Sequence, residues 1–407
     1  MKKICLSVVG LFLTYFGSFA QSTTDSAKYY NRSLQFEEAN IISSYYTQDG
    51  NNSAVTGGIG TEQLTDISNT FQLQYLRYDD KFRKHTWDFE LGIDHYTSAS
   101  SDMVDLKANS SASHADTRIY PSVNWTRENE KKGTSISLGA SYSHEFDYTS
   151  FGLGVGFSAK TKNRSGELSA KLQTYFDKVS QVLPTELVST VTTTTSASGS
   201  GGGDHVKYPT TPRNTYDFSL NYSQIINKSL QVMFLSDLVS QTGYLSLPFH
   251  RVYFADGSVH QENLPSSRLK LPLAFRASYF LGDKIILRAY YRYYTDDWGL
   301  KSNTINFETP VKLSPFVSVT PFYRYYQQTA VDYFAPYRAH TAADKYYVSN
   351  YDLAAFNSSF FGAGVRFMPA KGVFGMQHFN MLEVRYGHYQ KTTGMNSDII
   401  SLNLKFK

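Results

Sequence analysis

The sequence predicts an all-β protein: a transmembrane antiparallel up-and-down β-barrel of about sixteen strands, with fourteen as the alternative count. Apolar and polar residues alternate with a period of two along most of the chain, and the connections between these segments alternate between short and long. Aromatic residues make up 15% of the chain, and 32 tyrosines outnumber 28 phenylalanines. A barrel satisfies all its backbone hydrogen bonds within lipid, and tyrosine suits the membrane interface because its ring is apolar and its hydroxyl polar.

The first twenty residues have the pattern of a cleaved signal peptide. Lys2 and Lys3 precede an apolar run at 4–16, and Ser18-Phe19-Ala20 resembles a small-x-small cleavage site. A single membrane anchor is the alternative, but the run is shorter than the roughly 20 residues that a span requires. Residues 1–20 are therefore assigned to the signal and 21–39 to a periplasmic N-terminal segment. Cys5, the one cysteine, lies in the signal, so no disulfide, lipid anchor or cysteine metal site is expected afterwards.

Composition favours a barrel over the other folds considered. Hydrophobic residues make up 41% of the chain, and no segment after the signal could form a membrane helix. Barrels share this composition with soluble proteins because half of each strand faces a polar interior. A soluble β-sandwich is the alternative, but the length without a linker or repeat disfavours it. The 39 basic residues barely exceed the 35 acidic ones, which argues against a nucleic-acid partner.

The first eight strands show one apolar and one polar face. In the third, Trp87 and Phe89 point one way while Asp88 and Glu90 point the other; in the sixth, apolar residues alternate with glycine. These strands are expected at 40–48, 69–78, 84–96, 117–128, 133–146, 150–161, 166–178 and 213–226.

Eight further strands follow the same rule. The last one alternates up to Phe406 and is typical of the closing strand of an outer-membrane barrel. Pro121, Pro272 and Pro321 lie inside predicted strands and each removes a ladder donor, so bulges or strain are expected there. This second set is expected at 229–242, 268–282, 284–296, 302–309, 314–328, 357–369, 378–390 and 398–407.

The connections define two ends of the barrel. Short ones with turn chemistry fall at 79–83, 129–132, 162–165, 227–228, 282–283, 310–313 and 370–377, and these are expected to be periplasmic turns. The longest ones fall at 49–68, 97–116, 179–212, 243–267 and 329–356, and these are expected to be extracellular loops. Residues 40–407 thus form the barrel, with a low-complexity loop near 189–204. Its glycines are no phosphate loop, because neither a Lys-Ser/Thr pair nor a helix follows.

Inward-facing charges are the candidate selectivity residues. Two similar tetrapeptides, Tyr291-Arg292-Tyr293-Tyr294 and Tyr323-Arg324-Tyr325-Tyr326, place arginine inward and tyrosine outward. An arginine ladder would attract anionic solutes; the alternative is a lumen closed by ion pairs with inward carboxylates. The lumen candidates are Arg276, Arg288, Arg292, Arg324, Arg366, Glu90, Asp94 and Glu383.

The long loops carry a second set of candidates, for binding a partner or ligand. Residues 49–53 place oxygen ligands at alternate positions, as a Ca²⁺ loop does, but the closing glutamate is absent and an ordinary turn is favoured. The ten histidines are scattered without a zinc spacing, and no GxSxG element occurs, so neither a metal site nor an enzyme is expected. The loop candidates are Asp49, Asn51, His95, His250, Arg251, Asp296, Asp297, Trp298 and Tyr333.

Several of these segments resemble the bacterial outer-membrane family known as domain of unknown function 3570. The similar segments are 48–51, 55–62, 92–101, 248–254, 291–299, 332–337 and 380–388, while 183–210 departs as an insert. The resemblance implies an outer-membrane barrel and brings no established activity or ligand. It also implies a link to envelope redox proteins, although the chain has no redox cysteine or haem-attachment motif.

The expected protein is thus a porin-like barrel of the bacterial outer membrane, acting as a solute channel or as the barrel scaffold of an envelope complex. The alternative is a plugged barrel whose outer loops bind a lipoprotein or redox partner, and the third hypothesis is an outer-membrane lipid enzyme. The expected partners are outer-membrane lipid and, through the C-terminal strand, the barrel-assembly machinery. No cofactor is expected.

Overall fold

The computed structural model describes residues 33–98, 115–184, 186–187 and 208–407. The unit Gln35–Lys407 is separate from Met1–Leu34, and every strand among the described residues belongs to it. The predicted signal peptide, 1–20, and the low-complexity stretch, 189–204, lie outside the described residues. No helix in the described part of the chain is long and apolar enough to cross a membrane.

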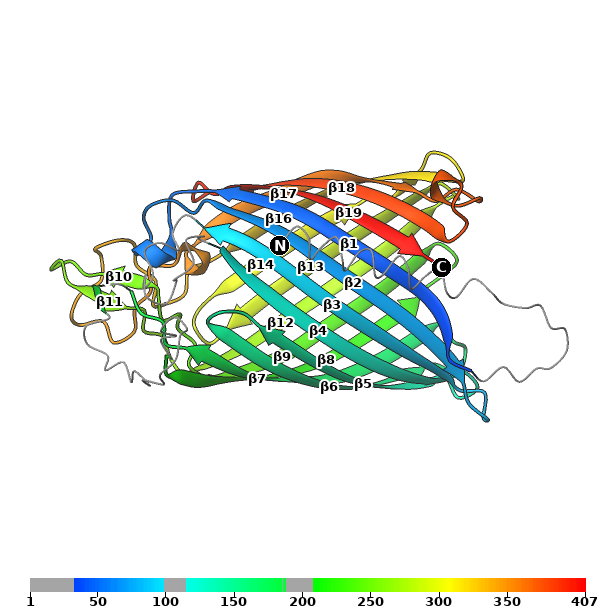
Figure 1. The fold of residues 1–407 in the computed structure, drawn as a ribbon, viewed down its shortest axis with the longest axis horizontal. Coiled ribbons are helices and arrows are strands. Elements are labelled where there is room, and N and C mark those ends of the chain that lie inside the picture. Colours follow the sequence, from blue (N-terminus) through cyan, green and yellow to red (C-terminus); the bar gives the residue numbers. More distant parts are fainter. Residues whose placement is uncertain (1–32, 99–114, 185, 188–207) are drawn as a thin grey trace, which may run out of the picture. The chain divides into compact units, whose positions relative to one another are not determined.

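The unit Gln35–Lys407 is a closed antiparallel barrel (Figure 1). Its sheet holds seventeen segments, of which β14 and β15 are two halves of one wall strand, because both pair with β13 on one side and β16 on the other. The wall therefore has sixteen strands, as the alternating pattern predicts, and not fourteen. The first nine are β1 (Gln35–Asp49), β2 (Leu64–Tyr78), β3 (Lys84–Ser98), β4 (Ala115–Asn129), β5 (Thr134–His144), β6 (Tyr148–Lys160), β7 (Gly166–Ser180), β8 (Thr210–Ile225) and β9 (Leu230–Gly243).

The other wall strands follow after a small hairpin, β10 (Arg251–Tyr253) and β11 (Val259–Gln261), which belongs to a separate two-stranded sheet. They are β12 (Ser267–Leu281), β13 (Ile285–Asp296), β14 (Lys301–Glu308), β15 (Val311–Lys312), β16 (Val317–Gln328), β17 (Phe356–Phe367), β18 (Phe379–Lys391) and β19 (Asn396–Phe406). Each wall strand pairs with the next, and β19 pairs with β1 from Ala39–Phe406 to Asp49–Asn396, which closes the ring.

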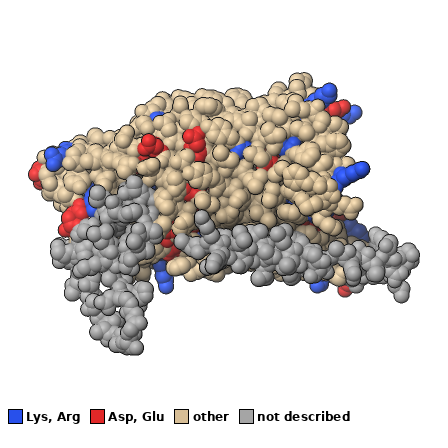
Figure 2. Space-filling model, turned by 45° about the horizontal axis from the view of Figure 1, so that its top comes forward, with Lys and Arg blue, Asp and Glu red and all other residues tan. Residues whose placement is uncertain are grey.

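The period-two pattern separates the two faces of the wall. On β6, the side chains of Phe151, Leu153, Val155 and Phe157 lie outward and are about half exposed, at 45–51%. Most of the outer surface visible in Figure 2 carries neither acidic nor basic residues. The opposite face of the same strands carries the polar and small residues, so the lumen is lined by hydrogen-bonding groups.

Each of the three strand prolines lies at a gap in one ladder. Around Pro121 the β4–β5 pairing skips two residues, and around Pro272 the β9–β12 pairing does the same. Pro321 faces the break between β14 and β15, which itself contains Pro310. The turn predicted at 310–313 is wrong. β15 continues the strand past Pro310, and the turn lies further along the chain, at 313–316.

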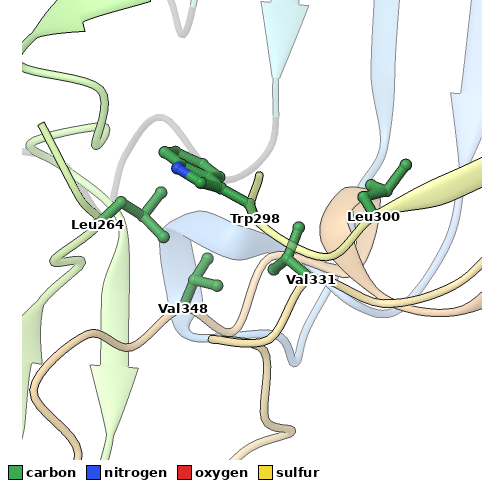
Figure 3. Packing of buried hydrophobic residues seen from close by; sticks show 5 residues of the cluster. All are labelled: Leu264, Trp298, Leu300, Val331 and Val348. Carbon is green, nitrogen blue, oxygen red and sulfur yellow. The ribbon is translucent and has the colours of Figure 1, made fainter. Parts of the chain in front are cut away.

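The two ends of the barrel differ. We call the end with the short connections the turn end, and the end with the long connections the loop end. At the loop end, a hydrophobic core forms outside the barrel wall from Leu264, Trp298, Leu300, Val331 and Val348. Figure 3 shows that these side chains come from separate connections, which pack on one another above the strand ends.

Candidate functional site

A hollow of about 730 Å³ in the barrel interior is lined by four of the five predicted lumen arginines. We call it the arginine hollow; its arginines are Arg276 on β12, Arg288 and Arg292 on β13, and Arg324 on β16. Their side chains point inward because all four share the inward phase of their strands in the observed register. One carboxylate, that of Glu308 on β14, lines the same hollow.

The arginines of the hollow have few anionic partners. Nη1 of Arg288 donates to Oε1 of Glu308 at 2.8 Å, and Nη2 of Arg385 lies 3.4 Å from the other oxygen of Glu308. Arg276 lies over the ring of Tyr290, with 5.7 Å to the centroid. Among the described residues, no ion pair joins Arg276, Arg292 or Arg324 to a carboxylate. The hollow therefore carries an excess of positive charge.

Two shielded polar atoms of the hollow have no hydrogen-bond partner: Nε of Arg292 and Oγ1 of Thr304. Nε of Arg324 donates to Oδ1 of Asn306 at a long 3.4 Å. A shielded guanidinium N–H without an acceptor is unfavourable, and an anion or a water in the hollow would relieve it.

The remaining lumen arginine belongs to another group. Arg366 on β17 donates from Nε to Oε2 of Glu383 on β18 at 2.6 Å, outside the arginine hollow. Arg385, which sequence reasoning missed, lies two residues further along β18 and stacks on Phe322 with 4.1 Å to the ring centroid. The sequence could have identified Arg385, because it lies two residues from Glu383 on the same strand and therefore points to the same inward face.

Two of the three predicted acidic lumen residues, Glu90 and Asp94, lie on a different part of the wall from the arginines, whereas Glu383 pairs with Arg366. Glu90 and Asp94 on β3 join Asp88 on the same strand and Asp66 on β2; we call these four the acidic wall. Neutral groups, not cations, donate to them. Nε2 of Gln72 donates to Glu90 at 2.8 Å, and the Ser68 and Tyr120 hydroxyls donate to Asp94 at 2.6 and 3.0 Å.

Below the loop end, the lumen contains a second hollow, of about 550 Å³. It is lined by Glu90 and Arg118 on one side and by Asp177 and Arg213 on the other. Nε of Arg213 donates to Asp177 at 3.1 Å, whereas Nε of Arg118 donates to the Ser143 hydroxyl at 2.9 Å. This hollow is thus mixed in charge, in contrast to the arginine hollow.

Two buried loop candidates, His250 and Arg251, each contact a glutamate at the loop end. His250 and Glu262 are 7% and 6% exposed, and Nδ1 of His250 lies 3.1 Å from Oε2 of Glu262. Arg251, 4% exposed, donates to both oxygens of Glu186 at 2.5 and 2.8 Å and to the backbone oxygen of Val55 at 2.6 Å. The Arg251 contacts join three separate loops, whereas the His250–Glu262 contact lies within the connection between β9 and β12.

Asp296 and Trp298 form a third such group. The side chain of Asp296 is 0% exposed, and its Oδ2 accepts from Nε of Arg268 at 2.9 Å and from the Tyr294 hydroxyl at 2.7 Å. Its Oδ1 accepts from the backbone N–H groups of Trp298 and Leu300 at 3.0 and 3.1 Å. The Arg268 guanidinium lies 4.3 Å from the Trp298 ring centroid. Every acceptor position of this carboxylate is in use.

The other loop candidates are spread over the loop end. The exposed Asp297 accepts from the backbone N–H of Leu269, and Tyr333 packs edge-on against Trp298 with 6.0 Å between the ring centroids. Asp49 accepts from the N–H of Gly50, Asn51 is exposed, and His95 on β3 contacts the Thr117 hydroxyl at 2.9 Å. The structure does not gather these residues into one site.

Glycines in the 50–63 loop allow it to pack on its neighbours. Gly57 and Gly58 have φ of 77° and 84°. A Cβ at Gly57 would lie 2.5 Å from the Tyr253 ring, and one at Gly58 would lie 2.6 Å from the backbone oxygen of Ser349. The motif at 55–62 thus supports close packing of three loops.

Three carboxylates lie together at the loop end and offer oxygen ligands. Single oxygens of Asp116, Glu145 and Asp147 lie within 4.8 Å of one another, and the Tyr96 hydroxyl lies 3.2 Å from oxygens of both Asp116 and Glu145. In the 145–147 connection, burial together with the neighbouring acids raises the pKa of Glu145 and of Asp147 above its ordinary value.

Residues 94–400, which are 307 of the 407 residues, match the family described as "Protein of unknown function (DUF3570)". The chain belongs to this family. The DUF3570 match covers the strands that carry the arginine hollow and most of the loop end. No curated protein matches the chain.

Solved structures similar to this DUF3570 protein are outer-membrane proteins of low sequence identity. The loop L8 deletion mutant of OmpT, an outer membrane protein of Vibrio cholerae, is 9% identical, with a TM-score of 0.46 and coverage of 92% of this chain and 99% of that one. OccK9 (OpdG) of Pseudomonas aeruginosa is 9% identical, with a TM-score of 0.41 and coverage of 92% and 97%. OprD of Pseudomonas aeruginosa is 9% identical, with a TM-score of 0.41 and coverage of 92% and 93%. The likeness concerns the fold alone.

Proposed function

We propose that this protein is a solute channel of the bacterial outer membrane, and that the arginine hollow binds the anionic group of the solute as it passes. The observation that carries the proposal is the composition of the hollow: four arginines and one carboxylate line about 730 Å³ inside the barrel.

The outer wall supports the membrane location. Outward side chains such as Phe157, Phe234 and Phe307 are 51–55% exposed. Contact of these rings with water would cost free energy, and a surrounding lipid removes that cost. With sixteen strands, both ends of the barrel segment lie at the turn end, which we assign to the periplasm because short connections face it in barrels of this kind. The outer-leaflet lipid and the machinery that inserts barrels through β19 are then its partners.

The chemistry of the hollow suits weak and reversible binding. A guanidinium is a planar fork that pairs with carboxylate or phosphate, and Arg276, Arg292 and Arg324 have no carboxylate partner among the described residues. Several such groups along one wall let an anionic group move from one to the next, which is the condition for conduction.

Single-channel recording in a planar bilayer tests the proposal. The refolded barrel should give stable conductance steps with chloride preferred over potassium. The double variant Arg276→Ala/Arg324→Ala should reduce this preference several-fold, because it removes two unpaired cations. Arg366→Ala, which removes an arginine paired outside the hollow, should change the preference less. A folded barrel, shown by heat-modifiable gel mobility, that never conducts would overturn the proposal.

The packed loop end favours a second candidate, a plugged barrel whose loops bind a lipoprotein or redox partner. Loops that hold one another through the contacts of Arg251 with Glu186 and with the Val55 backbone present a fixed surface, which is a requirement for a preorganised binding site. The same recording separates the two candidates, because a folded but silent barrel is the result that this one expects.

A further inference from the structure

The acidic wall and the arginine hollow lie on opposite sides of the barrel. In the closed ring, β3 is the third wall strand and β13 the eleventh, so eight strands separate them in either direction. The same holds for β2 and β12, the second and the tenth. Asp88 and Glu90 lie four and six residues from the turn end of β3, and Arg288 and Arg292 lie three and seven residues from the turn end of β13, so these carboxylates and arginines lie at similar heights on opposite sides of the ring.

Most charges on either side lack an ion-pair partner among the described residues. Arg288 pairs with Glu308, and Arg118, which lies opposite Asp94 on β4, donates to the Ser143 hydroxyl. Asp88 and Glu90 accept from the amides of Gln74 and Gln72 at 2.6 and 2.8 Å, and no ion pair involves Asp66, Asp88, Glu90 or Asp94 in the part of the chain that the structure describes. Oδ1 of Asp66 and Nε of Arg292 are both shielded and lack hydrogen-bond partners. Hydrogen bonds from neutral donors keep carboxylates ionised without cancelling their field.

Separate walls of opposite sign create a field across the lumen. Charges at close range within one wall would cancel as ion pairs, but charges on opposite walls act together on whatever lies between them. A solute with a single anionic group is attracted by the arginine side and repelled by the acidic side. A solute with a cationic group at one end and an anionic group at the other is attracted by both.

We infer that the preferred solutes are zwitterions with separated ammonium and carboxylate groups, such as amino acids and short peptides. The inference rests on the proposed channel function and deepens it by assigning a role to the acidic wall. The carboxylate end of the solute turns toward Arg276, Arg288 and Arg292, and the ammonium end turns toward Asp88 and Glu90.

Three probes of similar size and different charge test the assignment: diglycine as the zwitterion, succinate as the dianion and putrescine as the dication. Uptake of each labelled probe into proteoliposomes gives relative permeability, and calorimetric titration of the detergent-solubilised barrel gives relative affinity. The variants are Asp88→Asn/Glu90→Gln in the acidic wall and Arg276→Ala/Arg324→Ala in the hollow. Glu167→Gln is the matched control, because Glu167 faces inward near the turn end of β7 outside both walls.

The wild-type barrel should take up diglycine fastest. The acidic-wall variant should lose several-fold of the diglycine preference over succinate, and the hollow variant should lose the preference over putrescine. Glu167→Gln should leave the order unchanged. A wild-type preference for succinate, or an unchanged order in both wall variants, would overturn the inference while leaving the channel intact. If no probe crosses, the channel function fails, and the calorimetric order alone decides whether the opposed walls bind zwitterions.

Discussion

The loop end and the arginine hollow use the same residue types in opposite ways. At the loop end, Arg251 is buried and the side chain of Arg268 is 12% exposed, and each meets a carboxylate at hydrogen-bond distance. In the hollow, Arg276 and Arg324 face a space large enough for a solute, and no carboxylate pairs with them in the described part of the chain. Paired arginines hold loops together, and unpaired ones are available to a ligand. Position in the barrel, not residue type, separates the two roles.

Replacing one arginine from each region by alanine should give the largest difference in the free energy of unfolding. Arg268→Ala leaves Asp296 buried at 0% exposure without its cation, and it removes the cation over Trp298. Breaking a buried pair in this way costs about 3 to 5 kcal/mol in the free energy of unfolding. Urea unfolding, followed by heat-modifiable gel mobility, measures this cost.

Arg324→Ala is the matched lumen change. Its contacts among the described residues are weak: a hydrogen bond of 3.4 Å to Asn306, and the Phe360 ring with 5.8 Å to its centroid. The free energy of unfolding should therefore fall by less than about 1 kcal/mol while the chloride preference falls. Equal destabilisation by the two variants would contradict the distinction between structural and available arginines.

A glycine change should loosen the loop end without touching any charge. In Gly58→Ala the new Cβ would lie 2.6 Å from the Ser349 oxygen, at a φ of 84°. Gly394→Ala is the control: it has φ of 96° but nothing within 4 Å, so it reports strain alone. We expect Gly58→Ala to cost about 1 to 3 kcal/mol more than the control, because overpacking forces the backbone to shift. Protease cleavage within 50–63 measures the loosening, and identical cleavage of the two variants would argue against three-loop packing.

The smallest effect is a difference in pH response between two parts of the loop end. The Arg251 guanidinium lowers the pKa of Glu186, so the stability from this pair is present above the unfolded pKa of about 4.3 and is lost as the pH falls through the lower folded value. Burial raises the pKa of Glu145 and Asp147, so the 145–147 connection loses stability as the pH rises from about 4 through the raised values.

Hydrogen exchange between pH 7 and pH 4, corrected for intrinsic rates, distinguishes the two responses. Protection at 145–147 should rise on acidification, whereas protection around Arg251 should hold until the pH falls below about 4.3. The variant Asp147→Asn should flatten the first response and leave the second unchanged. Parallel responses at both places would show that one global opening event controls the loop end.

The sequence could predict the wall because strand register is a local property. Once Trp87 and Phe89 face lipid, Asp88 and Glu90 must face the lumen, and the inward phase of Arg276 and Arg292 follows from the same rule. At 310–313 the sequence predicts a turn around Pro310, but the strand continues past that proline. The β10–β11 hairpin was missed although Asp256-Gly257 is a hairpin turn signal, with Gly257 at φ of 87°.

The loop end could not be predicted, since its contacts join residues far apart in the chain. Arg251 binds the backbone of Val55, and Asn52 donates to the backbone oxygen of Thr393. His250, Arg251 and Asp296 have the composition of a binding site, and only the fold shows that their partners are Glu262, Glu186 and Arg268. The charges on each strand can be read from the sequence. Only the order of the strands in the closed ring shows that the acidic strands lie opposite the basic ones.

The seam between β1 and β19 joins the two ends of the barrel segment. Every other wall pairing joins strands that follow one another along the chain, whereas Ala39 and Phe406 are 367 residues apart, so we expect the seam to be the slowest pairing to form. Until the seam forms, β1 and β19 each present an unpaired edge, to which a second unfinished copy could add. A truncation before Asn396 would remove β19 and leave β1 and β18 as permanent edges, so we expect an open sheet prone to self-association and not a smaller barrel.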